Sequence, residues 1–146
     1  MLRSIRWAAA LAFFVLLLAA CGGGGGDEGG GELNKEAEAA CNGSALSEAP
    51  ELPASWPDIG DVTFTQQSIQ GPTNVVEGYF VGSVQAGHDE FKRELESAGF
   101  TILFDEVEED DSEVSWKGKG RSGQVALRHE CGDDDKIYVK VTNRPA

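Results

Sequence analysis

The chain lacks an apolar run long enough to cross a membrane. The uncharged residues 7–20, which precede Cys21 and the glycine run, would rise only about 21 Å as a helix, against roughly 30 Å for the hydrocarbon core of a bilayer. Arg3 and Arg6 precede this run, and small residues end it. A short positive segment, a short apolar run and small residues are typical of a secretory signal peptide, which we predict at residues 1–20.

The sequence also lacks the motifs that carry common chemistry. It has no Gly-x-Ser-x-Gly elbow, no His-Glu-x-x-His and no Cys-x-x-Cys, and its only two histidines, His88 and His129, stand far apart. The glycine run at residues 22–26 follows no strand and precedes no Gly-Lys-Ser/Thr, which excludes a phosphate loop. We therefore expect neither a cofactor nor a metal site, and we expect that the protein is not an enzyme.

Basic residues are scarce. The chain has 12 Lys and Arg against 25 Asp and Glu, a net charge of −13, which becomes −15 without Arg3 and Arg6. Nucleic acid is not an expected partner, because it binds to basic surfaces. We expect the acidic turns at residues 105–113 and 133–135 to be solvated. The alternative is a cation-responsive structural envelope protein that uses these turns, although neither has the spacing of a calcium loop.

Leu18-Ala19-Ala20-Cys21 follows the apolar run directly. This tetrapeptide resembles the lipobox of bacterial lipoproteins, in which a peptidase cleaves before the cysteine and the cysteine carries lipid. The resemblance implies lipidation of Cys21 and stable attachment through two or three acyl chains. It also implies an extracytoplasmic place in the bacterial cell envelope, on the outer leaflet of the cell membrane or, in a diderm, on the outer membrane.

If Cys21 carries lipid, Cys41 and Cys131 are the two cysteines that remain. In an oxidising compartment an even pair favours a disulfide, which we predict here; two free buried thiols are the alternative. The bond would close a loop of some ninety residues and contribute up to about 4–5 kcal/mol in the chain-entropy model.

Composition divides the mature chain into two parts. Residues 21–40 are rich in glycine and charge, so we predict a lipidated, disordered tether with a mean reach of roughly 25 Å. Within it, residues 32–40 favour a helix that is too short to be stable alone. Residues 41–146 are predicted to form a single domain, which begins with a proline-rich strap at residues 41–60.

Alternating apolar residues predict six strands in the domain. They are expected at residues 62–69, 74–84, 100–107, 113–118, 122–131 and 136–142. One helix is predicted at residues 87–98, with Phe91, Leu95 and Ala98 on one face and Gly99 at its end. The predicted fold is α+β: a two-layer sandwich of order β-β-α-β-β-β-β, with one helix on one face of a mainly antiparallel sheet of five to six strands.

The helix is too short to cover this sheet, so we expect Trp56 in the strap to cover the remainder. Alternation predicts that Phe80, Phe104 and His129 face the core, and that Gly78 leaves room for a helix to approach. His88, beside the predicted helix start, is expected to be exposed.

The opposite sheet face is a weak candidate binding surface. Its members are Tyr79, Val81, Leu103, Tyr138 and Arg128. Tyrosine and valine are ordinary on a half-solvated sheet, so they indicate a site only if they form one exposed patch. The basic turn at residues 117–121 is expected to be solvated, and capture of an anionic ligand there is the alternative.

The domain pattern resembles small α+β domains of uncharacterised bacterial lipoproteins. The residues that carry it are Leu52-Pro53, Trp56-Pro57, a Val/Gly/Phe strand, and a helix that ends Leu95-x-x-x-Gly99-Phe100. The resemblance covers about residues 51–141 and implies no activity.

Together these observations favour a membrane-anchored, non-catalytic binding or interaction module. We expect a monomer that reaches the membrane only through its lipid, with an envelope protein or a small molecule as partner. An enzyme that uses His129 is the remaining alternative. A cysteine–histidine pair of His129 and Cys131 would need a free thiol, and we expect Cys131 to be oxidised.

Overall fold

The computed structural model describes residues 30–146, and their side chains from Lys35 onward. In chain order its elements are α1 (Gly30–Cys41), β1 (Val62–Gln70), β2 (Thr73–Val81), α2 (Val84–Ser97), β3 (Thr101–Val107), β4 (Asp111–Gly118), β5 (Arg121–Arg128) and β6 (Lys136–Pro145). The predicted signal peptide, the lipidated Cys21 and the glycine run lie outside the described residues.

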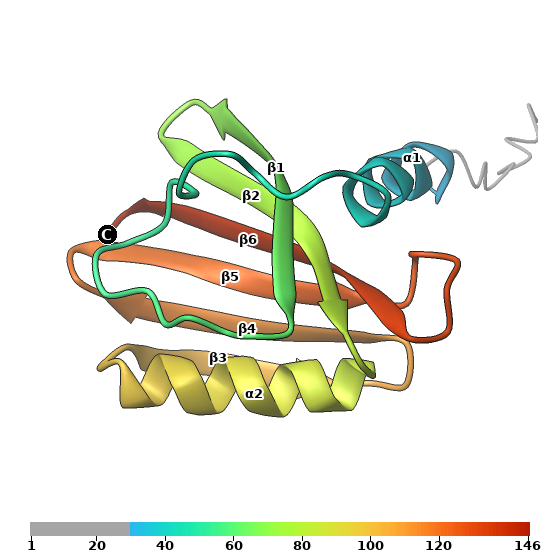
Figure 1. Ribbon diagram of the computed structural model, residues 1–146. Helices are drawn as coiled ribbons and strands as arrows, with labels where there is room; N and C mark the ends of the chain where they lie inside the picture. Colours follow the sequence, from blue (N-terminus) through green and yellow to red (C-terminus); the bar gives the residue numbers. More distant parts are fainter. Residues whose placement is uncertain (1–29) are drawn as a thin grey trace, which may run out of the picture.

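All six strands form one antiparallel sheet in the order β1-β2-β6-β5-β4-β3 (Figure 1). This confirms the α+β class and the antiparallel sheet. The segment between β2 and β3, which contains α2, carries the chain to the far edge of the sheet. There β3 begins an antiparallel meander. The meander runs back across the sheet until β6 pairs with β2, so β1 and β3 are the two edge strands.

Helix α2 starts earlier than the sequence pattern predicts. Gly82 has φ 144° and ends β2 just after Val81, so the strand does not continue to residue 84. Ser83 then caps the helix, because its Oγ accepts a hydrogen bond from the amide of Ala86. The helix therefore begins at Val84.

One face of the sheet, the inner face, carries α2 over β3, β4 and β5. Phe91 and Leu95 of α2 are fully buried in this core. The strap covers the remainder of the inner face. The ring centroid of Trp56, in the strap, lies 5.1 Å from that of Trp116 and 5.8 Å from that of Phe100, and both pairs pack edge to face. The strap thus completes a core that the helix is too short to cover.

The opposite, outer face carries α1, in a segment that the sequence pattern assigned to a disordered tether. Ala37, Ala40 and Cys41 are buried against Tyr138. A twelve-residue helix is marginal in isolation, but this packing and the disulfide from Cys41 to Cys131, with Cα atoms 5.4 Å apart, hold it on the sheet. The two-layer prediction is corrected here, because helices lie on both faces.

Polar contacts also tie α1 to the outer face. The hydroxyl of Tyr138 donates to the buried carboxylate of Glu77, and Lys140 Nζ lies 3.4 Å from both Glu77 Oε1 and Glu36 Oε2. Burial, together with the bond to Glu77, raises the pKa of Tyr138 far above its usual range. Thr65 Oγ1 donates to the carbonyl of Ala40 at 2.7 Å, near the end of the helix.

A bulge in β3 changes which side chains of that strand face the core. The pairing register shifts between Ile102 and Phe104, which leaves Leu103 as the extra residue. Phe104 is 51 % exposed instead of buried as predicted, since one extra residue reverses the alternation beyond it. Asp105 is thereby placed on the inner face, beside α2.

At Gly78 the neighbouring strand β1 passes very close. A Cβ at this position would lie 2.0 Å from the carbonyl oxygen of Thr63, beside the bulge in β1 between Phe64 and Gln66. The glycine therefore allows the approach of strand backbone, not of a helix as the pattern suggested.

Replacement of Gly78 by alanine should destabilise the fold, because the atom in the way is backbone and cannot rotate aside. We expect a loss of about 1–3 kcal/mol in the free energy of unfolding, measured by urea denaturation. Gly60→Ala is the matched control, since no atom lies within 4 Å of a Cβ there. Equal midpoints for the two variants would contradict the close approach.

Candidate functional site

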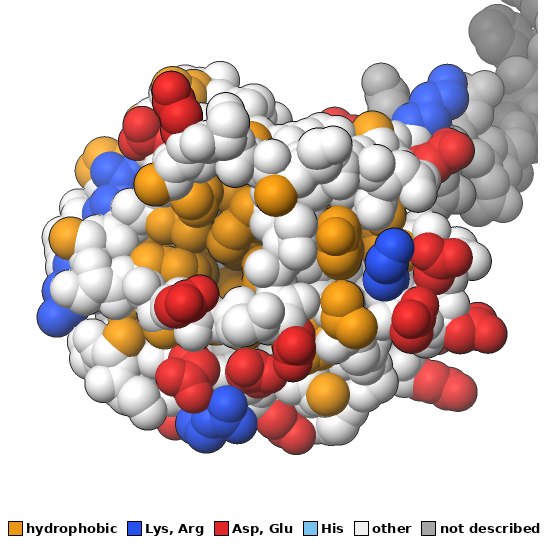
Figure 2. Space-filling view, in the orientation of Figure 1, with side chains coloured by type: hydrophobic (Ala, Val, Ile, Leu, Met, Phe, Trp, Pro, Cys, Tyr) orange, Lys and Arg blue, Asp and Glu red, His pale blue; other side chains and the backbone are white. Residues whose placement is uncertain are grey.

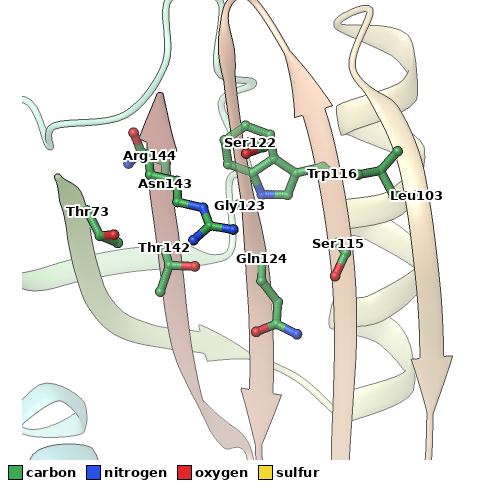
Figure 3. Close-up of a pocket in the computed structure, with 10 residues that line it drawn as sticks. All are labelled: Thr73, Leu103, Ser115, Trp116, Ser122, Gly123, Gln124, Thr142, Asn143 and Arg144. Carbon is green, nitrogen blue, oxygen red and sulfur yellow. The ribbon is translucent and has the colours of Figure 1, made fainter. Parts of the chain in front are cut away.

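The outer face of the sheet is only half covered. Helix α1 packs on β1, β2 and β6 at one end, around Tyr138. At the other end lies an open trough of about 410 Å³ (Figure 3), within the roughly 300–1,000 Å³ common for ligand sites. Its lining residues are Thr73, Leu103, Ser115, Trp116, Ser122, Gly123, Gln124, Thr142, Asn143 and Arg144.

The register of the strands explains the hollow. Two neighbouring rows of cross-strand partners form its floor: Thr142, Gln124 and Ser115 in one, Arg144 and Ser122 in the other. The serines on the two central strands are short. Longer side chains stand on either side, Leu103 on β3 and Arg144 on β6, as Figure 3 shows. Short side chains between long ones leave an open channel across the sheet.

The lining is polar and holds no acidic side chain, although the chain has 25 Asp and Glu. Arg144 is the only charged residue in the lining. Gln124 Nε2 donates to Glu113 Oε2 at 2.7 Å. This bond fixes the amide, so that Gln124 presents its Oε1 acceptor to a ligand.

A buried asparagine fixes the rim of the trough to the strap. Asn143 is 1 % exposed, its Oδ1 accepts from Arg121 Nε at 2.6 Å, and its Nδ2 donates to the carbonyl of Glu51 at 2.9 Å. One side chain thus joins β6, β5 and the strap. We infer that the floor of the trough is preformed.

The predicted binding face does not form one exposed surface. Tyr79, Tyr138 and Arg128 are neighbours in one cross-strand row, but Tyr138 is buried because α1 covers it. Val81 is exposed at the end of β2, and Leu103 lies on β3 beyond three intervening strands. Of the five residues only Leu103 lines the trough, so the condition that they form one contiguous exposed patch is not met.

The hydroxyl and amide residues of the trough were not singled out from the sequence. Ser115, Ser122, Gln124 and Thr142 are ordinary outward residues of half-solvated strands. The sequence shows only that each of these residues occupies a polar position in a strand of alternating polar and apolar residues. The strand order is what makes them neighbours, since it places β6 beside β5.

His88 is buried, contrary to the predicted exposure, because it lies three residues before Phe91 and seven before Leu95, on the face of α2 that packs on the sheet. Its Nδ1 lies 3.0 Å from Ser112 Oγ and its Nε2 lies 3.4 Å from Asp105 Oδ2. A serine, a histidine and an aspartate in a row resemble a nucleophilic triad. However, Ser112 is only 1 % exposed, so a substrate has no access to its Oγ. The three side chains instead connect helix α2 to the sheet.

His129 is exposed, and its predicted place in the core is wrong because β5 ends at Arg128, three residues before the predicted end at residue 131. Its Nδ1 lies 3.7 Å from Asp110 Oδ1, in a shallow polar hollow with Asp111 and Glu130. No Ser, Thr or Cys side chain that His129 could activate is among the residues that line this hollow.

The inner face has an apolar hollow of about 190 Å³ between the strap and α2. Figure 2 shows apolar side chains gathered at this place. Leu52, Trp56 and Phe64, which line it, are partly buried and pack on the main core. We interpret it as the seam along which the strap covers the sheet.

Two further features were sought in the part of the chain that the structure describes. Over residues 30–146, no three His, Cys, Asp or Glu side chains are grouped so that they would hold a metal ion. Neither described helix has both the length and the apolar character that a bilayer span requires.

In comparisons with known proteins, no family model matches the chain and no curated protein matches it.

The ion pair between α2 and β3 should appear in the pH dependence of stability. Lys92 Nζ lies 2.8 Å from Asp105 Oδ2, and this hydrogen bond lowers the pKa of Asp105 below its ordinary 3.8. A lowered pKa stabilises the fold above pH 3.8, and the effect is lost as the pH falls through the folded-state value.

Asp105→Asn should therefore lower the melting temperature at neutral pH and flatten its decline below about pH 4. Glu106→Gln, a neighbouring change on the same strand, serves as the control, because Glu106 forms no ion pair within residues 30–146. A curve for Asp105→Asn that runs parallel to wild type would contradict the assignment.

Proposed function

We propose that the protein is a non-catalytic binding module, held outside a bacterial membrane by lipid on Cys21, and that the outer-face trough is its binding site. One observation carries the proposal. The half of the outer face that α1 leaves open is a hollow of about 410 Å³ with a polar, acid-free lining. A role in binding a ligand would account for an acid-free hollow on a chain with a net charge of −13.

The trough is open without any movement of α1. The helix is fixed by its disulfide to Cys131 and by the contact of Glu36 with Lys140. Its footprint lies on β1, β2 and the start of β6, whereas the trough lies over β4, β5 and the end of β6. We therefore assign α1 the role of a fixed connector and not of a lid.

The arrangement also suits a tethered protein. In Figure 1, α1 lies at one end of the sheet, and the turn from β4 to β5 and the C-terminus lie at the other. The trough is at this second end, with Ser122 and Arg144 in its lining. Because the chain reaches α1 from Cys21, the site is placed away from the anchor.

Lipid, and not the domain surface, is proposed to supply the membrane attachment. The net charge of the chain without its signal is −15, which opposes adsorption to anionic headgroups. Two acyl chains would hold the protein stably without any apolar patch. The lipobox at residues 18–21 supports this part of the proposal.

Cys21→Ala should abolish lipid labelling without altering the fold. In cells fed a fatty-acid analogue, the wild type should be labelled and the variant unlabelled. The melting temperature of the domain should not change, since the disulfide uses Cys41 and Cys131. Gly22→Ala is the control and should be labelled like wild type. Labelling of Cys21→Ala equal to that of wild type would contradict lipidation at Cys21.

Binding at the trough is tested by mapping ligands on the whole mature chain carrying Cys21→Ala. Against a mixed library of water-soluble small molecules, amide shifts in NMR spectra should collect on β4, β5 and the end of β6. Ser122→Leu should abolish them by filling the trough. Ser68→Leu makes the same change on the exposed edge strand β1 and should have no effect. Shifts that collect elsewhere would contradict the proposal.

A further inference from the structure

We propose that the trough binds an anionic sugar, a hydroxyl-rich ring that carries a carboxylate or a phosphate. The inference rests on the proposed function and adds the class of ligand. It follows from three properties of the trough: the kind of polar group on its floor, the sign of its charge, and the side chains on its rim.

The floor offers hydroxyl groups and one oriented amide. Ser115, Ser122 and Thr142 can each donate and accept a hydrogen bond, and Gln124 presents an acceptor because Glu113 holds its nitrogen. Neighbouring strands lie about 4.8 Å apart, comparable with the separation of hydroxyls on opposite sides of a six-membered ring. A molecule with alternating donors and acceptors matches this grid better than an apolar one.

The charge of the trough selects an anion. Arg144 lines it and is exposed, whereas Arg121 is already engaged by Asn143. Lys117 is the cross-strand partner of Ser122 and extends the positive end of the trough. A guanidinium binds carboxylate or phosphate through two parallel hydrogen bonds. The rest of the chain is strongly acidic, so this end is where an anion is least repelled.

The rim suits a sugar ring. Leu103 and Phe104 are both exposed beside the trough because of the bulge in β3, and they offer apolar contact to the C–H face of a ring. Trp116, the aromatic residue in the lining, is fully buried, so any stacking on a nucleotide base would fall to Phe104 at the rim.

Titration of the mature chain carrying Cys21→Ala with three probes tests this inference. Glucuronic acid carries a carboxylate, glucose 6-phosphate carries a phosphate, and glucose carries no charge. We expect the trough amides to shift with at least one anionic sugar at millimolar concentration, with an affinity at least about tenfold above that for glucose. The anionic probe that binds more tightly shows whether the trough prefers a carboxylate or a phosphate.

Three variants separate the contributions. Arg144→Gln should weaken binding of the anionic sugar about tenfold, because it removes a charge-assisted bond. Lys119→Gln removes the same charge from the adjacent turn but outside the lining, and should change affinity less than about twofold. Thr142→Val removes one floor hydroxyl at constant shape and should also weaken binding, which keeps the test valid should the Arg144 variant unfold.

Two results would overturn the inference: equal affinity for glucose and the anionic sugars, or an unchanged affinity in both Arg144→Gln and Thr142→Val. If none of the three sugars shifts the trough while other library compounds do, the ligand class is wrong and the proposed function stands. If all shifts fall outside the trough, both the inference and the proposed function fail.

Discussion

Coverage of the sheet is the constraint on which the rest of this structure depends. Six strands present two broad faces, and the described part of the chain has two helices of 12 and 14 residues to place on them. Helix α2 covers part of the inner face, and a proline-rich strap built around Trp56 covers the remainder. Helix α1 covers part of the outer face, and within residues 30–146 no second strap covers the rest of it. The trough is the region that this shortage of cover leaves open.

Local patterns made the elements predictable from the sequence. All six strands and α2 follow from apolar alternation and from the apolar stripe of Phe91 and Leu95, and hairpin-length turns indicate antiparallel pairing. The docking of α1 did not follow, because a short helix is stabilised by tertiary contacts that the local sequence does not display. The early start of α2 depends on two small residues, Gly82 and Ser83, whose roles appear only with their dihedral angles and hydrogen bonds.

Non-local geometry accounts for what remained unpredicted in the site. The strand order sets β6 between β2 and β5, and this alone turns unremarkable polar positions into one floor. The bulge at Leu103 moves Phe104 outward and Asp105 inward, although strict alternation predicts the reverse. His88 lies three residues before Phe91 on the buried face of α2, and its contact with Ser112 follows from the packing of that helix on β4. Register and bulges are properties of pairs of strands, and a single strand does not reveal them.

The disulfide also determines how the domain would carry mechanical load. A pull between a lipid-held N-terminus and a ligand in the trough enters the domain through α1 and reaches Cys41. From there the covalent bond passes the force directly to Cys131 and then to β6, whose residue Arg144 lines the trough. The intervening residues 42–130 form a closed loop in parallel with this path. The strap, β1 and α2 lie outside this direct covalent path, whereas β4 and β5, which also line the trough, would take part of the load through Ser115, Ser122 and Gln124.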